Sequence, residues 1–462
     1  MKNLFISLLM IAFTVSCKKS QEKKQNVEDS KRPNIIFIFA DDWGYGDLGI
    51  HGSTFVETPN LDKMASEGID FENFTVNNPV CSPSRVAVMT GHYPARYSIH
   101  RHFARADHQI ENDMPDWLDP NAPMLPRLLK KAGYKTGHFG KWHLADNRAS
   151  DAPLLTSYGI DEYAAFNAPG KENISYEQSV PRALDFIKKN KDTTFFMNVW
   201  IHETHTPFYP IEEYMEKYKD LDERKQVYAS IIAEGDAGVG SILNLLKDLN
   251  IDDNTLVIFS SDNGPEYAHS DSDKSLKGGY GEYYSVGETG GLKGEKRSLY
   301  AGGIRVPFIV RWPGVATKGK RDSTSVVTAV DLLPTFLEIA GLELPNGYKP
   351  DGESALAAIK GEDFKRTKPI YWEWEGPKLR ESIWPKHGIQ DGRWKLITNT
   401  DLAKTELYDL ESDWAENIDV SSEYPDIVEQ LLEKVYAWEK TLPLEPNENS
   451  ISVDRRNLRQ VE

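Results

Sequence analysis

The feature that most constrains the fold is an uninterrupted apolar run near the start of the chain. Residues 34–40 read NIIFIFA and end at the acidic pair Asp41-Asp42. A strand with one solvated face alternates apolar and polar residues, whereas an unbroken run of this length is typical of a strand buried on both faces of a parallel sheet. Comparable runs occupy residues 195–201 and 255–260. The sequence therefore predicts several buried, mostly parallel strands.

Helical patterns separate these runs. Thr58-Pro59 is a typical helix start, because Thr is a frequent N-cap and Pro is tolerated in the first turn. Helical spacing of apolar residues predicts further helices over residues 126–131, 226–249 and 330–340. Strands that alternate with helices predict an α/β fold, in which a large mixed, mostly parallel central sheet carries helices on both faces.

The pattern changes after about residue 365. Short strand candidates separated by turns occupy residues 370–374, 389–391, 394–397 and 406–408. A helical segment, residues 427–438, follows them. We predict a small antiparallel sheet with one helix. The expected domains are thus a catalytic domain over residues 34–365 and a C-terminal subdomain over residues 366–462.

The first residues are typical of an export signal. Lys2 precedes an apolar segment, residues 4–15, that is too short to cross a membrane comfortably. Cys17 follows where bacterial lipoprotein signals are cleaved and acylated, so we expect a lipoprotein-type signal peptide over residues 1–16 and lipidation of Cys17. An ordinary signal peptide with an incidental cysteine is the alternative. The polar residues 17–33 are expected to form a flexible tether, with the lipid as the only membrane contact. The two lysines after Cys17 favour the periplasm over the cell surface.

Overall charge limits the classes of partner. The formal net charge is −17, which argues against a nucleic-acid-binding protein. The same charge repels any anionic small substrate. An enzyme acting on an anion would therefore need a local cluster of cationic side chains.

Polar side chains follow two of the predicted strands. Asp41 and Asp42 end the first run, and Asp262-Asn263-Gly264 follows the run that begins at residue 255. Ligands bind outside the carboxyl ends of strands in α/β sheets. Three carboxylates and one amide supply only hard oxygen donors, which suit Ca²⁺ or Mg²⁺ rather than zinc. Either group alone is more typical of a helix cap or a solvated turn, and their shared placement is what favours a metal site.

The chain has two cysteines, Cys17 and Cys81. If Cys17 carries lipid, Cys81 has no disulfide partner, which points to a chemical role. Residues 81–91 read CSPSRVAVMTG. This C-x-P-x-R-x4-T-G pattern resembles the formylglycine signature of type I sulfatases, members of the alkaline phosphatase superfamily. The resemblance implies that a formylglycine-generating maturation enzyme oxidises Cys81 to 3-oxoalanine, and that Ca²⁺, or Mg²⁺, is the cofactor.

The chemistry of sulfate esters explains such a residue. A serine could attack sulfur, but its own sulfate ester would be hard to hydrolyse. A hydrated aldehyde has two hydroxyls on one carbon, of which one attacks sulfur and forms the sulfo-enzyme intermediate. The other loses a proton, re-forms the aldehyde and expels sulfate. A helix N-terminus and a metal would both favour the developing negative charge.

Other segments resemble the same family and imply roles for particular residues. Residues 34–49 and the S-D-N-G of residues 261–264 match segments that supply the metal ligands. The implied metal set is Asp41, Asp42, Cys81, Asp262 and Asn263. Arg85 would bind the hydrated aldehyde.

Three further motifs complete the expected catalytic set. Gly140-Lys-Trp-His143 matches a G-K-W-H motif, in which Lys141 would contact sulfate and His143 would accept the elimination proton. His205, in H-E-T-H-T-P, would contact sulfate, although Thr204 replaces the usual Pro. In LKGEKRSLYAGGIRVP, residues 292–307, the alignment selects Lys296 rather than Lys293 as the lysine that protonates the leaving oxygen, and Ala301 replaces the usual Glu.

Substrate-binding residues are expected outside the shared motifs. Candidates are His100, Arg101, His102 and Arg105 in the loop 97–110, and His387 in the C-terminal subdomain. Trp372, Trp374 and Trp384 are candidates for stacking on sugar rings. The resemblance implies a sulfated carbohydrate, either an algal polysaccharide such as ulvan or carrageenan or a glycosaminoglycan oligosaccharide. A phosphonate or phosphate ester hydrolase of the same superfamily and a non-catalytic glycan-binding lipoprotein remain as alternatives.

Overall fold

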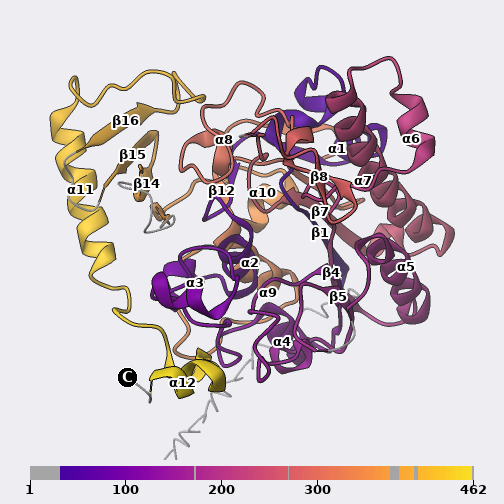
Figure 1. Ribbon diagram of the computed structural model, residues 1–462, viewed down its shortest axis with the longest axis horizontal. Coiled ribbons are helices and arrows are strands. Elements are labelled where there is room, and N and C mark those ends of the chain that lie inside the picture. The colour runs from indigo at the N-terminus through magenta and orange to yellow at the C-terminus, as the bar shows by residue number, and fades with distance from the viewer. Residues whose placement is uncertain (1–31, 171–172, 269, 375–383, 400–403, 460–462) are drawn as a thin grey trace, which may run out of the picture. The chain divides into compact units, whose positions relative to one another are not determined.

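The computed structural model is built around an eight-stranded sheet with strand order β11-β2-β10-β7-β1-β6-β4-β5. Strands β1, β4, β5 and β7 of this sheet are labelled in Figure 1. Its strands are β1 Asn34–Ala40, β2 Ile69–Phe71, β4 Lys135–Lys141, β5 Glu162–Phe166, β6 Phe195–Trp200, β7 Thr255–Ser261, β10 Phe308–Arg311 and β11 Lys320–Asp322. β1 pairs in parallel with both β6 and β7. β10 runs antiparallel to its two neighbours, β7 and β2. The mixed, mostly parallel sheet predicted from the sequence is confirmed.

Helices cover both faces of this sheet. Alternate side chains of β1 enter two different cores, Ile35, Phe37 and Phe39 on one face and Ile36, Ile38 and Ala40 on the other. The first core includes α2 Cys81–Thr90, α4 Leu125–Leu129 and α9 Leu332–Ile339, and the second includes α1 Pro59–Ser66, α5 Ser179–Asn190 and α7 Glu223–Asp248. Because β1 is buried on both sides, its apolar run is continuous.

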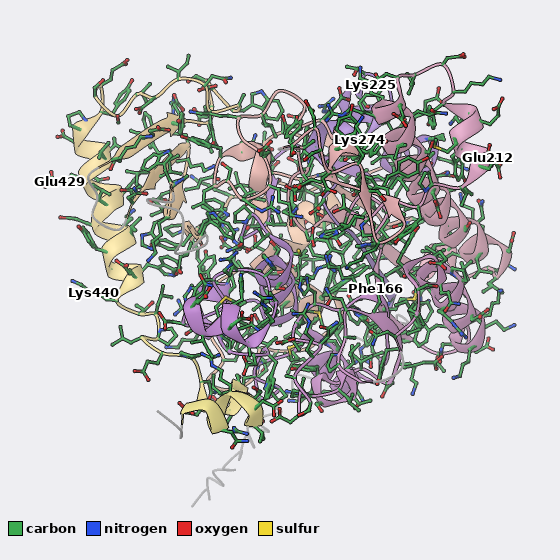
Figure 2. The ribbon with its side chains drawn as sticks, in the orientation of Figure 1. Phe166, Glu212, Lys225, Lys274, Glu429 and Lys440 are labelled. Atoms are coloured by element: carbon green, nitrogen blue, oxygen red, sulfur yellow. The ribbon has the colours of Figure 1, made fainter. Side chains whose placement is uncertain are left out.

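The predicted helix starts differ in detail. Thr58 occupies the N-cap position of α1, but its side chain makes no capping bond and its hydroxyl donates to Asp62 at 2.9 Å. α7 starts earlier than expected because Asp222 caps it by accepting from the Lys225 backbone N–H at 3.2 Å. Figure 2 shows Lys225 among the exposed side chains near the start of α7.

The C-terminal segment forms a separate antiparallel sheet, confirming that prediction. Its order is β13 Ile370–Glu373, β14 His387–Asp391, β15 Trp394–Thr398 and β16 Thr405–Asp409. α11 Pro425–Glu439 packs against β14 and β15 through an apolar core, and its outer side carries exposed residues such as Glu429 (Figure 2). Trp372 and Trp374 are 1% and 3% exposed, so the prediction that these two rings stack on sugars is wrong.

The structure describes residues 32–170, 173–268, 270–374, 384–399 and 404–459. Arg32–Glu462 form one compact unit, and the domain boundary at residue 365 stays a prediction. The signal peptide and Cys17 lie outside the described residues. Within the described residues, no helix has the length and apolarity needed to cross a membrane. Smaller elements are β3 Phe74–Thr75, β8 Ser275–Leu276, β9 Gly279–Tyr280, β12 Val327–Thr328, α3 Ala106–Glu111, α6 Glu212–Lys217, α8 Ala301–Ile304, α10 Leu356–Lys360 and α12 Val453–Arg459.

Candidate active site

The predicted oxygen ligands meet at the carboxyl ends of two neighbouring strands. Asp41 and Asp42 follow β1, and Asp262 and Asn263 follow β7. The four side chains are at most 2% exposed. Oxygens of the three carboxylates lie within 4.8 Å of one another. Asp42 has a φ of 65°, a left-handed conformation of the kind that concentrates at functional sites.

These residues fit a hard divalent cation. Asp41 Oδ1 and Asn263 Oδ1 are buried without a hydrogen-bond partner among the described residues. Asn263 Nδ2 donates to Asp42 Oδ1 at 2.6 Å, which leaves the Asn263 oxygen available. Burial and then the charge of Asp41 raise the pKa of Asp262 to about 7. Three crowded carboxylates and an unpartnered amide oxygen form the donor set that calcium or magnesium would satisfy.

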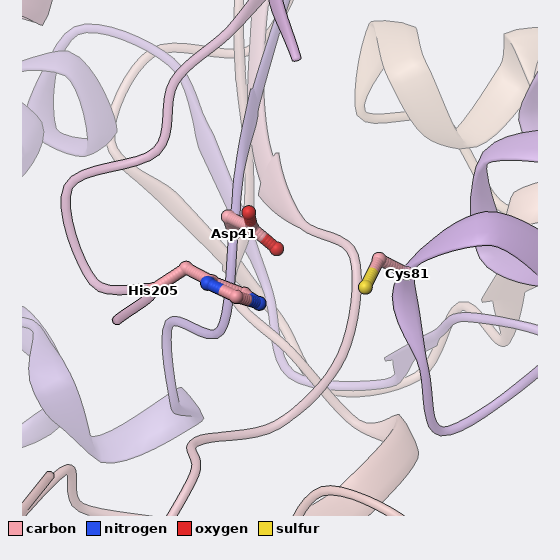
Figure 3. Close-up of side chains that lie close together, drawn as sticks. All are labelled: Asp41, Cys81 and His205. Atoms are coloured by element: carbon pink, nitrogen blue, oxygen red, sulfur yellow. The ribbon is translucent and has the colours of Figure 1, made fainter. Parts of the chain in front are cut away.

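Cys81 faces this cluster from the first position of α2 (Figure 3). Its Sγ, a carboxylate oxygen of Asp41 and a ring nitrogen of His205 lie within 4.8 Å of one another. The residue is 4% exposed, and burial raises the pKa of its thiol. An unmodified thiol here is therefore held protonated and is a weak nucleophile.

Arg85 lies one turn after Cys81 on α2. Its guanidinium donates to Asp262 Oδ2 through Nη2 at 2.6 Å and through Nε at 3.1 Å. It also stacks on Trp200, with 4.9 Å between the guanidinium carbon and the ring centroid. These contacts fix a permanent positive charge beside residue 81.

Lys141 and His143 enter the site from the end of β4. Lys141 Nζ lies 2.5 Å from Asp41 Oδ2. Burial alone would raise the pKa of Asp41, but Lys141 and then His205 keep that pKa well below its usual value. His143, with a φ of 54°, contacts the Phe103 carbonyl through Nε2 at 2.9 Å, so its Nδ1 carries the lone pair. Burial and Lys141 lower the pKa of His143 to about 3, which keeps this ring neutral with Nδ1 unprotonated.

The segment after β6 supplies His205. His205 Nδ1 contacts the Thr206 carbonyl at 2.7 Å, and its ring stacks on His202 with centroids 5.0 Å apart. His202 Nδ1 contacts Asp41 Oδ2 at 3.1 Å, so both histidines border the cluster. Thr204, which departs from the family pattern, donates its hydroxyl to the Asp41 carbonyl. The departure therefore adds a contact to the metal-site backbone.

Lys296, and not Lys293, lies at the cluster. Lys296 Nζ is 2.6 Å from Asp42 Oδ2 and 3.2 Å from Glu266 Oε2. Burial would lower the pKa of Lys296, but these two carboxylates raise it above its usual value. Lys293 Nζ points elsewhere and donates to the Tyr408 hydroxyl at 2.9 Å. The placement agrees with the alignment that selected Lys296.

The loop of Lys296, residues 293–303, which we call the lysine loop, packs against the segment that follows β7. Gly264 N donates to the Gly303 carbonyl at 2.9 Å. A Cβ on Gly264 would lie 1.8 Å from the Gly302 carbonyl oxygen, so only glycine permits this approach. The two loops are thereby joined backbone to backbone next to Asp262 and Asn263.

A carboxylate from a distant part of the chain contacts the backbone of Ala301. Ala301 stands at the position where the sulfatase pattern has Glu. Glu416 Oε2 accepts from the Ala301 backbone N–H at 2.9 Å, and Glu416 Oε1 lies 2.6 Å from Lys395 Nζ. Lys395 Nζ also donates to the Leu299 carbonyl at 2.8 Å. Both charged side chains are buried. The carboxylate of Glu416, from the C-terminal segment, thus contacts the lysine loop at the position where Ala301 replaces the usual Glu.

The predicted substrate-binding residues lie in different environments. Arg101 and His102 are close to the site, and the His102 ring centroid is 6.3 Å from that of His143. His100 Nδ1 pairs with Glu373 Oε1 at 2.5 Å. Arg105 is largely exposed beside Asp107, whereas His387 is 2% exposed within β14. The structure does not bring these five residues together, and their roles stay predictions.

Sequence reasoning missed Glu266 and Glu416. Glu266 comes two residues after Gly264, close enough to the D-N-G motif to have been considered a partner for Lys296. Glu416 lies more than a hundred residues from Ala301, and no local pattern marks it. The replacement of the usual Glu by Ala301 was the one signal in the sequence that this region is packed differently.

Taken together, the geometry defines a class of enzyme. A cluster of oxygen donors that fits a divalent cation faces the first residue of a helix, with two lysines and an arginine around it. Such a site binds and polarises an anionic ester, and supplies the local positive charge that a chain of net charge −17 needs. This arrangement is typical of the class of metal-dependent hydrolases of anionic esters.

Comparison with known proteins narrows this class. The family model described as Sulfatase matches residues 33–342, and that of N-sulphoglucosamine sulphohydrolase, C-terminal, matches residues 287–441. The chain is 32% identical to the N-acetylgalactosamine-6-sulfatase of Homo sapiens, covering 78% of this chain and 72% of that protein. It is 26% identical to the N-acetylgalactosamine-6-O-sulfatase of Bacteroides thetaiotaomicron, covering 92% and 96%. The crystal structure of Ps i-CgsB in complex with k-i-k-neocarrahexaose has a TM-score of 0.75 at 28% identity, covering 93% and 96%.

The chain therefore belongs to the sulfatase family, is a sulfuric ester hydrolase and has the alkaline phosphatase-like fold. Enzymes of this family generally use formylglycine and a divalent metal. The non-catalytic alternative is excluded by this assignment.

Proposed function

We propose that this enzyme removes sulfate from a sulfated glycan, using Cys81 after its conversion to formylglycine and a calcium or magnesium ion at Asp41, Asp42, Asp262 and Asn263. The observation that carries the proposal is the position of residue 81. It lies at a helix N-terminus within 4.8 Å of Asp41 and His205, facing the oxygen-donor cluster. Burial makes the unconverted thiol a poor nucleophile, which supports conversion.

A formylglycine at position 81 would supply two hydroxyls on one carbon when hydrated, and a divalent cation would supply Lewis acidity toward oxygen. The chain's own residues do the rest. Asp41 and Asp42 would hold the cation, and Lys141 and Lys296, which contact these carboxylates, would then bind sulfate oxygens. Lys296 is positioned to protonate the leaving alcohol, and His143 Nδ1 to accept the proton that sulfate release requires.

The proposed substrate is a glycosaminoglycan-type glycan with a 6-O-sulfated N-acetylhexosamine. Two relatives, one from Homo sapiens and one from Bacteroides thetaiotaomicron, carry the name of an N-acetylgalactosamine 6-sulfatase. The latter covers nearly the whole chain. A carrageenan is the second candidate, because Ps i-CgsB was crystallised with k-i-k-neocarrahexaose and superposes with a TM-score of 0.75.

A substrate panel tests the proposal. The full chain is co-expressed with a formylglycine-generating enzyme and loaded with calcium. Sulfate release is measured from a 6-sulfated chondroitin disaccharide, an iota-carrageenan oligosaccharide and an aryl sulfate, and phenol release is measured from an aryl phosphonate ester. Release from the chondroitin disaccharide with a kcat/KM well above that of the aryl phosphonate is the expected result. Faster turnover of the phosphonate than of every sulfate would replace sulfatase by phosphonate hydrolase as the function.

The proposed cellular location is the periplasm, with attachment through lipid on Cys17. The support is the leader sequence and the polar residues that follow it. Metabolic labelling with a fatty acid analogue and cell fractionation test this, with a Cys17→Ser variant as the unlabelled control. Release of the unsubstituted chain without any lipid would contradict it.

A further inference from the structure

Arg101 is a buried cation without a carboxylate partner among the described residues. It is 6% exposed. Its one hydrogen bond joins Nη1 to the neutral Asn112 side chain at 3.3 Å, and its Nε has no partner. A buried guanidinium that lacks an anion is costly, because desolvation is not offset by an ion pair. Burial, followed by repulsion from Arg297, lowers the pKa of Arg101 to about 10.

The loop of Arg101 is fixed beside residue 81. The Phe103 backbone N–H donates a hydrogen bond to Ser82 Oγ at 3.1 Å, and Ser82 is the neighbour of Cys81. This bond fixes the position of the loop. The Phe103 carbonyl contacts His143 Nε2 at 2.9 Å. Arg101 thus lies two residues before Phe103, whose backbone N–H is bonded to Ser82 of α2.

Arg297 approaches residue 81 from the other chain segment, the lysine loop. Its backbone N–H donates to the Pro79 carbonyl at 3.0 Å, two residues before Cys81, and its φ of 69° is left-handed. The guanidinium pairs with Glu266, which also contacts Lys296 at 3.2 Å. One carboxylate therefore faces two cations.

Among the residues that the structure describes, no carboxylate forms an ion pair with Arg101. His102 and His108 lie near it, and burial lowers the pKa of both rings, so they remain neutral. Glu111, on the exposed side of α3, is a weak and more distant partner. Glu266 is shared by Lys296 and Arg297, and Glu282 and Glu111 act on Arg297 and Arg101 only as additional electrostatic partners.

We propose that Arg101 and Arg297 form a subsite for a second anionic group on the glycan, a carboxylate or a further sulfate next to the ester that is cleaved. This inference rests on the proposed function, because the second anion is placed relative to a sulfate ester bound at residue 81. It makes the enzyme selective for acidic glycans over sulfated sugars that carry one charge. Two guanidiniums from separate loops suit planar carboxylate or tetrahedral sulfate oxygens.

Three disaccharides test the subsite. All contain the same 6-sulfated N-acetylgalactosamine. The first carries an unmodified uronate, the second has that carboxyl reduced to an alcohol, and the third is carboxyl-reduced but bears a second sulfate. We expect kcat/KM for the first or the third to exceed that for the second by about tenfold or more, as loss of a buried charge contact requires. Whichever compound is preferred identifies the source of the anion.

Variants connect this preference to the two arginines. Arg101→Gln and Arg297→Gln should each reduce the preference to within about twofold, and Arg182→Gln, an exposed arginine on α5, should retain it. The Arg297 side chain is 40% exposed, so its variant provides a result if Arg101→Gln does not fold. Equal kcat/KM for all three disaccharides in the unsubstituted enzyme, or a preference that survives both variants, overturns the subsite.

A binding experiment separates this inference from the proposed function. The inactive Cys81→Ser protein is titrated with the same three disaccharides by calorimetry. Tighter binding of an acidic compound than of the reduced one supports the subsite even if no sulfate is released. Sulfate release without any discrimination removes the subsite and leaves the proposed function intact. Absence of binding by all three compounds overturns both.

Discussion

The two sides of the active site are fixed by different parts of the molecule. The oxygen cluster of Asp41, Asp42, Asp262 and Asn263 is held by adjacent parallel strands, β1 and β7, whose ends it follows. The lysine loop opposite it is joined to the segment after β7 by backbone hydrogen bonds and, in addition, contacts Glu416 and Lys395 of the C-terminal segment. The difference indicates that the oxygen cluster depends on the central sheet, whereas lysine placement depends on both the central sheet and the C-terminal segment.

The largest expected effect comes from the oxygen cluster. Asp262→Asn removes one ligand charge and the partner of Arg85, and should lower kcat by about a thousandfold or more together with metal content. Metal analysis and sulfate release are measured on the same preparation. Asp220→Asn, an exposed aspartate, is the control. Full activity of Asp262→Asn in the presence of a chelator would refute the metal assignment.

Lys296 provides the next largest effect. Lys296→Ala should lower kcat by about a hundredfold, because a cation aimed at developing charge is lost, while metal content stays close to normal. The Lys293 side chain contacts Tyr408 and lies away from the oxygen cluster. Lys293→Ala should therefore lower kcat only about a few-fold. If the two substitutions exchanged their effects, the alignment of the lysine loop would be wrong.

Glu416 tests the influence of the C-terminal subdomain. Glu416→Gln leaves the Lys395 ammonium buried without its ion pair, so the free energy of unfolding should fall by about 3 kcal/mol. We also expect kcat to fall about tenfold as the lysine loop loosens, with metal affinity unchanged. Glu423→Gln, an exposed residue of the same subdomain, is the matched control. A loss of metal affinity equal to that of kcat would show that the two sides of the site are not independently fixed.

The smallest expected effect is a pH dependence of stabilisation by calcium. Asp262 has a pKa raised from 3.8 to about 7 in the metal-free fold, first by burial and then by Asp41. Between these pH values the fold keeps a proton that the unfolded chain has lost, so the metal-free protein loses stability as pH rises through this window. Calcium requires the carboxylate, and its stabilising effect should grow over the same range. Melting temperatures with calcium and with a chelator, from pH 5 to pH 8, should diverge; a constant gap would contradict this origin.

The sequence was sufficient for the side of the site that follows strands. The apolar runs before Asp41 and Asp262 located two strands, and parallel pairing then brings their ends together. β4, which carries Lys141, was not predicted, because its polar and glycine-containing sequence KTGHFGK lacks an apolar run. Glu416 could not be predicted, since its contact with Ala301 depends on how two distant segments pack. Trp372 and Trp374 were assigned to sugar binding because composition alone does not distinguish an exposed ring from a core ring.

The state of residue 81 tests the central claim most directly. The enzyme is produced with and without a co-expressed formylglycine-generating enzyme, and the peptide containing residue 81 is analysed by mass spectrometry alongside sulfate release per molecule of protein. We predict that activity rises in proportion to the aldehyde fraction and that Cys81→Ala has none in either preparation. Full sulfate release by protein that carries an unmodified thiol at this position, or by Cys81→Ala, would contradict the account.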